Sequence, residues 1–464
     1  MSLIRNTSMI PFDSKLLGGS LTTTAMAALW SEERLLASWI AVWRAITEAQ
    51  AEMEIIPLEA ARDIVAHLEP DRLPLERIAA RSREAGHTFV GFLRAFREGC
   101  GPAAEHFHVG PTTQDILDTA LVLQLREAQT LIDDSLARLV RALCRRAEEY
   151  RDTPMMGRTH EQHALPCTFG FVLAGWALEL QEHVERGAEA RERWLLGCLS
   201  GGVGTQSAFV ALTDTRRARE LERRVCERLD LPVPVMDLHT RLDRFAELTS
   251  YLALLTATLG RIGLHLRTME RPEVGEIRLR YGEDACNSST MPNKRNPDQL
   301  ENVQGLAQLV AGHASAMLAT RPADHRDSTR VPVLYAALPQ SFAMAHVGTV
   351  TVADAIETLE ADPHRMHSNI HHPANLGQAV CERVMIAMYR KTGRRHEAHS
   401  LLSRLAHESR TSRRPIRELM ELEPDLRARF EDAEWEALFR LEEYTGTAAA
   451  QVDAVVARIR SVGA

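Results

Sequence analysis

The sequence has 464 residues, of which 45% are apolar and 25% charged, and its formal net charge is -8. These values are those of an ordinary folded protein and exclude a largely disordered chain. The acidic balance gives no electrostatic basis for binding nucleic acid, so no nucleic-acid partner is expected. The length exceeds what one hydrophobic core usually serves, and about three domains are expected.

The N-terminal residues, the longest apolar runs and the cysteines indicate the cellular compartment of the protein. The N-terminal residues lack an apolar stretch of signal-peptide length, and no run of about 18 uncharged apolar residues follows, so no membrane association is expected. The seven cysteines are scattered and never arranged as Cys-x-x-Cys, which predicts reduced thiols. A cytoplasmic protein is expected.

Apolar residues recur at spacings of three and four along most of the chain, which predicts amphipathic helices. The predicted helices cover residues 26–53, 116–150, 169–198, 209–229, 242–269, 300–319 and 333–360. Glycine and proline cluster between these stretches, and no alternating strand pattern of useful length is found. The expected fold is all-α, with a central bundle of long helices and smaller helical domains at both ends.

Breaks in the helical pattern predict three domains: residues 1–111, an N-terminal helical domain; residues 112–362, the central bundle; and residues 363–464, a C-terminal helical domain. A helix of about 30 residues is about 45 Å long. Several such helices need apolar partners along their whole length, and one five-helix bundle supplies these poorly. An oligomer is therefore expected.

The segment from Ser288 to Pro297 combines serine, lysine and asparagine with two prolines, just before the predicted helix 300–319. Such a segment is typical of a mobile loop anchored at a helix start, and loops of this kind often close over substrates. Lys294 is one of only three lysines among 55 basic residues. Where arginine is the usual cation, a lysine indicates a need for a compact ammonium group.

Residues Ser288 to Pro297, hereafter the signature segment, resemble the Ser-Ser-x-Met-Pro-x-Lys-x-Asn-Pro signature of the fumarase/aspartase superfamily. Two further blocks occur in the order of that superfamily. The first is His108, Gly110, Thr112, Thr113, Asp115, Asp118 and Thr119, and the second is Gly157, Arg158, Thr159, His160, Gln162, Pro166 and Phe169. Within the superfamily, the chain resembles the adenylosuccinate lyase and carboxymuconate cycloisomerase branch over nearly its whole length.

The resemblance implies a proton abstraction beside a carboxylate, which creates a dianion that cations and fixed donors must stabilise. It assigns Ser288 as the general base, and Lys294 and Asn296 as the groups that bind the substrate carboxylate and the dianion. A free hydroxyl is a poor base, so Ser288 needs Lys294, loop amides and water exclusion to help it. Ser289 and Met291 are expected to bind substrate.

His160 is implied as the general acid that protonates the leaving group, a role that suits the titration range of histidine. Thr159 is expected to bind substrate beside it. His160 and His163 form His-Glu-Gln-His, which is one residue short of the zinc motif His-Glu-x-x-His. With no third ligand evident, no metal is expected.

The first block implies a carboxylate site at a helix start, where free amides and hydroxyls suit an anion. Thr112 and Thr113 are expected to contact a substrate carboxylate, although plain N-capping is the alternative. His108 is expected to help orient the leaving group or the general acid. His87 matches a histidine of the adenylosuccinate lyase pattern, but Thr88 replaces the aspartate expected beside it. Arg241 and Arg244 are candidates for contacting an acidic substrate.

The resemblance implies a fumarate-releasing lyase that cleaves a C–N bond of a substituted succinate, such as adenylosuccinate or nitrosuccinate, without a cofactor. It also implies a homotetramer whose active sites take residues from three subunits. One alternative is a 3-carboxy-cis,cis-muconate cycloisomerase, which His160 disfavours because the bacterial enzymes tend to carry tryptophan there. A non-catalytic structural homologue is the other, and the presence of Ser288, Lys294, Asn296 and His160 disfavours it.

Overall fold

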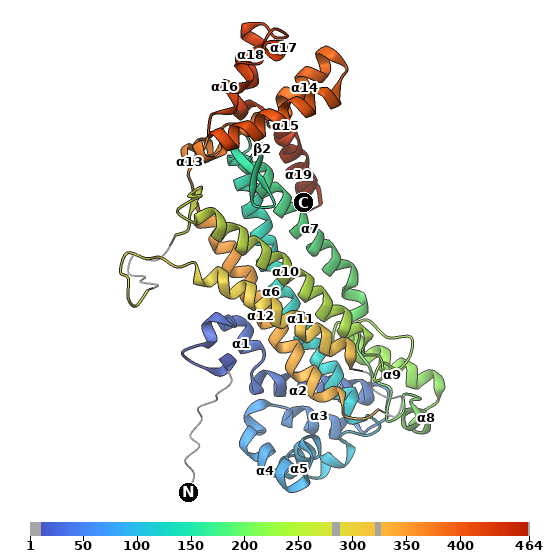
Figure 1. Ribbon diagram of the computed structural model, residues 1–464. Helices are drawn as coiled ribbons and strands as arrows, with labels where there is room; N and C mark the ends of the chain where they lie inside the picture. The colour runs from blue at the N-terminus through green and yellow to red at the C-terminus, as the bar shows by residue number, and fades with distance from the viewer. Residues whose placement is uncertain (1–10, 281–287, 321–325, 463–464) are drawn as a thin grey trace. The chain divides into compact units, whose positions relative to one another are not determined.

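The computed structural model describes residues 11–280, 288–320 and 326–462, and nearly all of its regular structure is helical. The predicted all-α fold is confirmed. Long helices dominate the drawing in Figure 1. They are α6 (Thr113–Glu149), α7 (Phe169–Trp194), α10 (Asp243–Glu270), α11 (Asp298–Ala319) and α12 (Arg330–Thr358).

The chain divides into two compact units, and each is discontinuous in sequence. The first unit contains Met1–Leu136, His183–Gly260 and Asn302–Val350, and the second contains Ala137–Glu182, Arg261–Glu301 and Thr351–Ala464. Each long helix therefore contributes one part to each unit. The three sequence domains 1–111, 112–362 and 363–464 stay a prediction.

The first unit adds short helices to its parts of the long ones: α1 (Thr24–Leu29), α2 (Glu32–Glu52), α3 (Leu58–His67), α4 (Leu75–Ala85), α5 (Thr88–Cys100), α8 (Ser207–Leu212) and α9 (Thr215–Arg228). An aromatic core joins α2 to α5, where the rings of Trp43 and Phe92 stack with centroids 4.2 Å apart. Buried Phe89 and Phe96 extend this core.

Two helices expected to be continuous are interrupted by a capping residue. The predicted helix 26–53 breaks before α2, where the Ser31 side chain accepts a hydrogen bond from the Arg34 amide. The predicted helix 209–229 breaks between α8 and α9, where Asp214 accepts one from the Arg217 amide. Serine and aspartate are strong N-caps because their side-chain oxygens satisfy free amides of a first turn. In both cases a new helix begins at the capping residue, although apolar residues keep a helical spacing on both sides of it.

The second unit contains a β-hairpin that the sequence did not predict. Strands β1 (Pro154–Thr159) and β2 (Gln162–Thr168) pair antiparallel, with an irregularity between Met156 and Arg158. At Gly157, in that irregularity, a Cβ atom would lie 2.5 Å from the Leu165 carbonyl oxygen, so only glycine allows the strands to come this close. A second, two-residue pair joins β3 (Ile277–Arg278) to β4 (Glu360–Ala361).

The C-terminal part of the second unit consists of α13 (Pro363–Ile370), α14 (Cys381–Thr392), α15 (Arg395–Ser412), α16 (Ile416–Glu421), α17 (Pro424–Arg427), α18 (Asp432–Leu438) and α19 (Ala448–Val462). Their core includes Leu402, Met420 and Trp435, and Met156 of β1 belongs to it. The hairpin is therefore built into the core that the C-terminal helices share.

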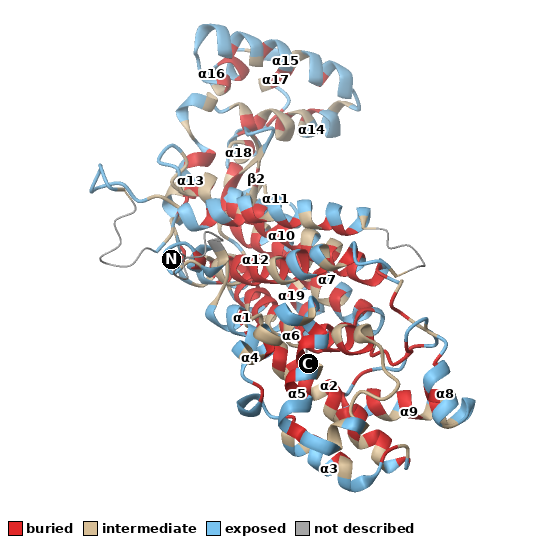
Figure 2. Cartoon of the chain, turned by 90° about the horizontal axis from the view of Figure 1, so that it is seen from below, coloured by how far each residue is buried: buried red, intermediate tan, exposed pale blue. Residues whose placement is uncertain are grey.

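Short 3-10 helices complete the described structure: η1 (Pro11–Asp13), η2 (Gly18–Ser20), η3 (Pro70–Arg72), η4 (Gly101–His106), η5 (Pro373–Asn375), η6 (Gln378–Val380) and η7 (Leu441–Glu443). Figure 2 shows buried residues concentrated along α6, α10 and α12, whereas α15 is largely exposed. Across the described ranges, no helix is both long enough and apolar enough to cross a lipid bilayer.

Candidate active site

The signature segment belongs to the second unit and leads directly into α11. The Ser288 hydroxyl oxygen accepts a hydrogen bond from the Met291 amide at 3.0 Å, and the Lys294 amide donates to the Met291 carbonyl at 3.1 Å. Ser289, Met291 and Lys294 are exposed, and Ser288 and Asn296 are half-buried. The backbone thus bends around Ser288 and presents the Lys294 side chain to solvent.

His160 lies in the same unit, at the tip of the β1–β2 hairpin. Thr159 pairs with Gln162, which leaves His160 and Glu161 as a two-residue loop with φ values of 51° and 61°. Two consecutive positive φ values define the type I′ hairpin turn, which asparagine and glycine usually occupy. Side chains are strained in this conformation, and such strain is concentrated at functional sites. The turn leaves His160 and Thr159 exposed.

A buried ion pair anchors the hairpin just below its tip. Arg158 donates two parallel hydrogen bonds to Glu276, at 2.7 and 3.0 Å, and Glu276 is fully buried. Asn369 of α13 donates a third bond to the same carboxylate at 2.9 Å. A bidentate arginine–carboxylate pair fixes orientation as well as distance. His160 therefore extends from a base that side chains of three separate segments hold.

The start of α6 lies in the first unit and carries Thr112 and Thr113. Here the helix is capped by Asp115, whose carboxylate accepts the Thr112 amide at 2.8 Å. The same buried carboxylate accepts the amides of Ser200 at 2.7 Å and Gly201 at 3.1 Å. Asp115 thus ties the expected carboxylate-binding turn to the glycine-rich loop that follows Leu199.

His108 lies just before this turn, with a φ of 59°, against the rings of Trp43 and Phe89. Its apolar surroundings bury it and lower its pKa to about 4, so the imidazole is neutral at neutral pH. The Trp43 indole N–H points at His108 Nδ1 over 3.4 Å. If Nδ1 accepts, Nε2 carries the proton and can donate to an anion.

The remaining predicted residues of the first unit have separate surroundings. His87 is exposed and caps α5, with its Nδ1 accepting the Val90 amide at 3.4 Å. Arg241 is exposed and pairs with Asp243 at 3.2 Å. Arg244 is buried rather than on a helix surface, and donates to the Leu196 carbonyl at 3.2 Å. Burial lowers the pKa of Arg244.

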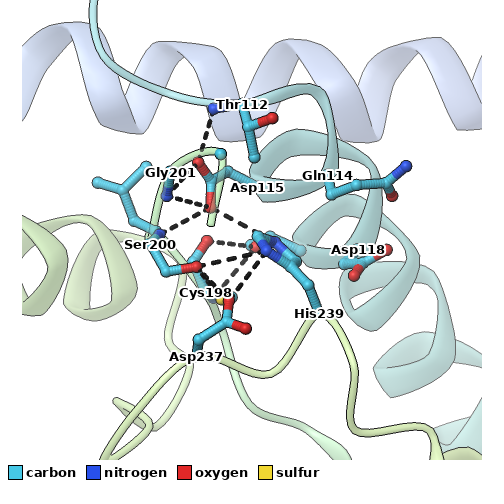
Figure 3. A network of polar contacts seen from close by, with 12 residues as sticks. Thr112, Gln114, Asp115, Asp118, Cys198, Ser200, Gly201, Asp237 and His239 are labelled. Atoms are coloured by element: carbon cyan, nitrogen blue, oxygen red, sulfur yellow. Dashed lines mark hydrogen bonds and ion pairs between the residues drawn. The ribbon is translucent and has the colours of Figure 1, made fainter. Parts of the chain in front are cut away.

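A buried polar network that sequence reasoning did not predict surrounds Asp115 (Figure 3). His239 Nδ1 lies 3.0 Å from Asp237 and its Nε2 lies 3.5 Å from Asp115. Burial alone would lower the pKa of His239, but the hydrogen bond to Asp237 and the nearby Cys198 raise the pKa to about 10. The imidazole therefore lies between the carboxyl groups of Asp237 and Asp115, and burial raises the pKa of Asp115.

Arginines close the network on both sides. Arg326 donates to Asp237 at 2.6 Å. Arg330, which is buried, donates to the His239 carbonyl at 2.6 Å and to both oxygens of Asp118 at 3.0 Å. Asp118 lies one turn after Asp115 on α6, so the two arginines and His239 surround a cluster of carboxyl groups behind the Thr112–Thr113 turn.

The predicted site residues therefore divide between the units. Those of the first unit are His87, His108, Thr112, Thr113, Arg241 and Arg244, and those of the second are Thr159, His160, Ser288, Ser289, Met291, Lys294 and Asn296. The sequence signal for the buried network was the pair Asp115 and Asp118 in the first block. The roles of the predicted site residues in substrate binding and catalysis stay predictions.

Comparison with known proteins identifies the family. The family described as Lyase matches residues 19–312, which is more than half of the chain. The chain belongs to the fumarase/aspartase superfamily. A second family, Adenylosuccinate lyase C-terminus, matches residues 377–455 and covers α14 to most of α19.

Similar proteins of this superfamily align along nearly their whole length. An adenylosuccinate lyase of Pyrococcus horikoshii is 33% identical over 433 residues, covering 93% of this chain and 94% of its own. An N-acetyl-S-(2-succino)cysteine lyase of Enterococcus italicus is 31% identical, covering 97% and 98%. The solved structure of a 3-carboxy-cis,cis-muconate lactonizing enzyme from Pseudomonas putida has a TM-score of 0.87 and 29% identity, covering 97% and 100%. The resemblance drawn from the sequence is confirmed.

Proposed function

We propose that this lyase releases fumarate from a substituted succinate by β-elimination, with cleavage of a C–N bond. The observation that carries the proposal is the complete signature segment, with Ser288, Lys294 and Asn296 in one stretch without regular structure before α11. The names of the relatives agree with β-elimination from a substituted succinate, because the succinyl group is bound to nitrogen in adenylosuccinate and to sulfur in S-(2-succino)cysteine.

In the proposed reaction, Ser288 removes a proton from the carbon beside one substrate carboxylate, and the electrons of that C–H bond move into the carboxylate. Lys294 and Asn296 stabilise the dianion that forms. The C–N bond then breaks, its electron pair leaves with nitrogen, and His160 gives nitrogen a proton. The remaining carbons form the double bond of fumarate. The proposed elimination needs no oxidant and no cofactor.

The other predicted residues hold the substrate. Thr112 and Thr113, backed by Asp115 at the start of α6, suit a carboxylate. Neutral His108 suits a donor to the leaving group, and Thr159, Ser289 and Met291 lie beside the catalytic groups in sequence. His87, Arg241 and Arg244 are proposed substrate contacts, the two arginines for an acidic group, although the buried position of Arg244 also suits a supporting role.

The proposed enzyme is a homotetramer in which three subunits complete each site. The residues assigned to one reaction belong to two different units of the chain. Sharing between subunits would let distant motif blocks meet, and it would explain why His160 and Lys294 are exposed in a single chain.

The leaving group is the open part of the proposal. An adenylosuccinate-type or nitrosuccinate substrate is the first candidate, and a sulfur-linked succinate is suggested by the Enterococcus relative. The alternative function, a 3-carboxy-cis,cis-muconate cycloisomerase, is supported by the similarity to the Pseudomonas structure. A non-catalytic homologue is the third candidate.

The deciding experiment follows ultraviolet absorbance for fumarate as the protein meets adenylosuccinate, argininosuccinate, aspartate, nitrosuccinate and N-acetyl-S-(2-succino)cysteine. One of these should yield fumarate. Ser288→Ala and Lys294→Met should each lower kcat by about 10²–10⁴-fold, because each removes a group that acts in the transition state.

Two matched variants control for general damage. Ser461→Ala changes an exposed serine on α19, and Lys391→Met changes a lysine whose partner is Glu434 on the surface. Both should keep full activity. Turnover that survives in Ser288→Ala would refute the proposed base. Silence across the panel, with interconversion of a muconate lactone, would establish the cycloisomerase instead.

A further inference from the structure

The second unit contains a histidine cluster that the proposed reaction does not use. Four histidines fall within nine residues, at His364, His367, His371 and His372, from the first turn of α13 to just beyond its end. His367 and His371 are four residues apart, so successive helical turns place them on one face. Their ring centroids lie 5.2 Å apart.

A carboxylate completes this cluster from a distant part of the chain. Glu442 of η7 places Oε2 3.3 Å from His371 Nε2. Ligand atoms of His367, His371 and Glu442 all lie within 4.8 Å of one another. Within the described residues, Glu442 Oε2 is buried and accepts no hydrogen bond. An acceptor oxygen in that position needs a cation or a donor.

We propose that His367, His371 and Glu442 bind a divalent transition metal ion such as Zn²⁺, which links α13 to η7. Imidazole nitrogen and carboxylate oxygen are ordinary zinc ligands at about 2.0–2.2 Å, so two ligands on a tetrahedral ion lie about 3.3–3.6 Å apart. The 3.3 Å between His371 and Glu442 fits that separation. Water would fill the fourth position.

The competing explanation is an ion pair between protonated His371 and Glu442. A proton joins only two of the three groups and leaves His367 out. A second imidazolium packed against the first would also repel it. A metal ion binds the lone pairs of all three groups at once. The site is also accessible from solvent, because the His371 and Glu442 side chains are 43% and 31% exposed.

The link has a structural consequence inside the second unit. Arg365 and Asn369 of α13 both donate to the Val274 carbonyl at 2.9 Å, and Asn369 also donates to Glu276, the partner of Arg158 in the hairpin. A metal that holds η7 against α13 would therefore brace the helix that supports the hairpin. The bound ion acts as a structural clip.

The test uses the full chain after treatment with a chelator, titrated with Zn²⁺ in competition with a chromophoric chelator. One ion should bind per chain. His367→Ala and His371→Ala should each weaken binding by more than tenfold, and Glu442→Gln should weaken it by about tenfold. Replacing Zn²⁺ by Co²⁺ should give visible absorption bands that disappear in the double variant His367→Ala/His371→Ala.

His364→Ala is the matched control, since it removes an exposed histidine of the same helix that is not one of the three proposed ligands. It should bind the ion like the unmodified chain. Zn²⁺ should also raise the melting temperature of the unmodified chain and of His364→Ala, but not of the double variant. The proposal fails if the unmodified chain binds no ion stoichiometrically, or if the double variant binds as tightly.

Discussion

Several buried charged groups of the first unit lie next to groups of opposite charge. His239 lies between Asp237 and Asp115, and Arg330 donates to Asp118. Removing one partner of such a pair leaves a buried charge uncompensated, which typically costs about 3–5 kcal/mol. The network therefore fixes where the first turn of α6 lies. We propose that its residues position Thr112 and Thr113.

The charge on His239 makes stability depend on pH. Its folded-state pKa of about 10 exceeds the ordinary value of 6.5. The protonated imidazole therefore adds its full stability below about pH 6.5, and that contribution disappears as the pH rises through 10. Urea unfolding from pH 6 to pH 10 should show a falling free energy, and His239→Gln should flatten the fall.

Other groups titrate in the same range, so the comparison needs a second variant. His396→Gln changes an exposed histidine on α15 and should keep the slope of the unmodified chain. The same slope in His239→Gln would show that His239 is not charged in the folded protein.

Helical elements were the most predictable part of the molecule. The five long helices follow from apolar residues repeated over six or more turns, and their ends differ from the predicted ones by a few residues. The hairpin could not be predicted in this way. Its strands lack alternation, and its turn is His160–Glu161 instead of the asparagine–glycine pairs that identify a type I′ turn.

The predicted site shows the same limit. Motif residues were found because each block is local in sequence. Arg330 reaches Asp118 across 212 positions, and Asp237 has no motif of its own. Such pairs arise only when helices pack, so no local pattern predicts them. Asp115 was found in its block, but its hydrogen bonds to the amides of Thr112, Ser200 and Gly201 were not predicted.

One close contact between elements gives a sharp test of packing. Gly170, in the first turn of α7, lies against the end of α6. A Cβ atom there would be 2.5 Å from the Ala147 carbonyl oxygen and 2.7 Å from Arg151 Cα. These neighbouring atoms belong to the backbone and can move aside only at a cost in energy. Gly170→Ala should therefore lower the free energy of unfolding by about 1–3 kcal/mol. Urea midpoints at a fixed protein concentration measure this.

Gly175, on the same helix, is the matched control. Nothing lies within 4 Å of a Cβ atom at this exposed position. Gly175→Ala should therefore raise the free energy of unfolding by about 1 kcal/mol, the usual gain in a helix interior. Equal effects of the two changes would mean that α6 and α7 do not approach as described.

At the scale of the whole molecule, the long helices expose apolar side chains that a single chain does not cover. Leu254 of α10 is 53% exposed, and Leu309 and Leu318 of α11 are 52% and 62% exposed. Exposed leucines are common one at a time. The proposed tetramer would bury these exposed leucines of α10 and α11 between subunits.

Sedimentation velocity tests the assembly. The unmodified chain should sediment with four times the mass of one chain. Leu254→Glu and Leu309→Glu should each yield smaller species, because a charge at a subunit interface is costly to bury. Leu422→Glu, at a position 66% exposed between α16 and α17, should leave the assembly intact. A stable monomer of the unmodified chain would refute the shared-site proposal.

Because lysine is rare in this chain, proteolytic cleavage after Lys294 can report ligand binding at the signature segment. A protease that cuts only after lysine has three target bonds in this chain, after Lys15, Lys294 and Lys391. Lys391 lies within α14, where helical backbone resists cleavage, whereas Lys294 lies in an exposed stretch without regular structure. Cleavage there yields fragments 1–294 and 295–464, so a gel can show when a bound ligand covers this stretch.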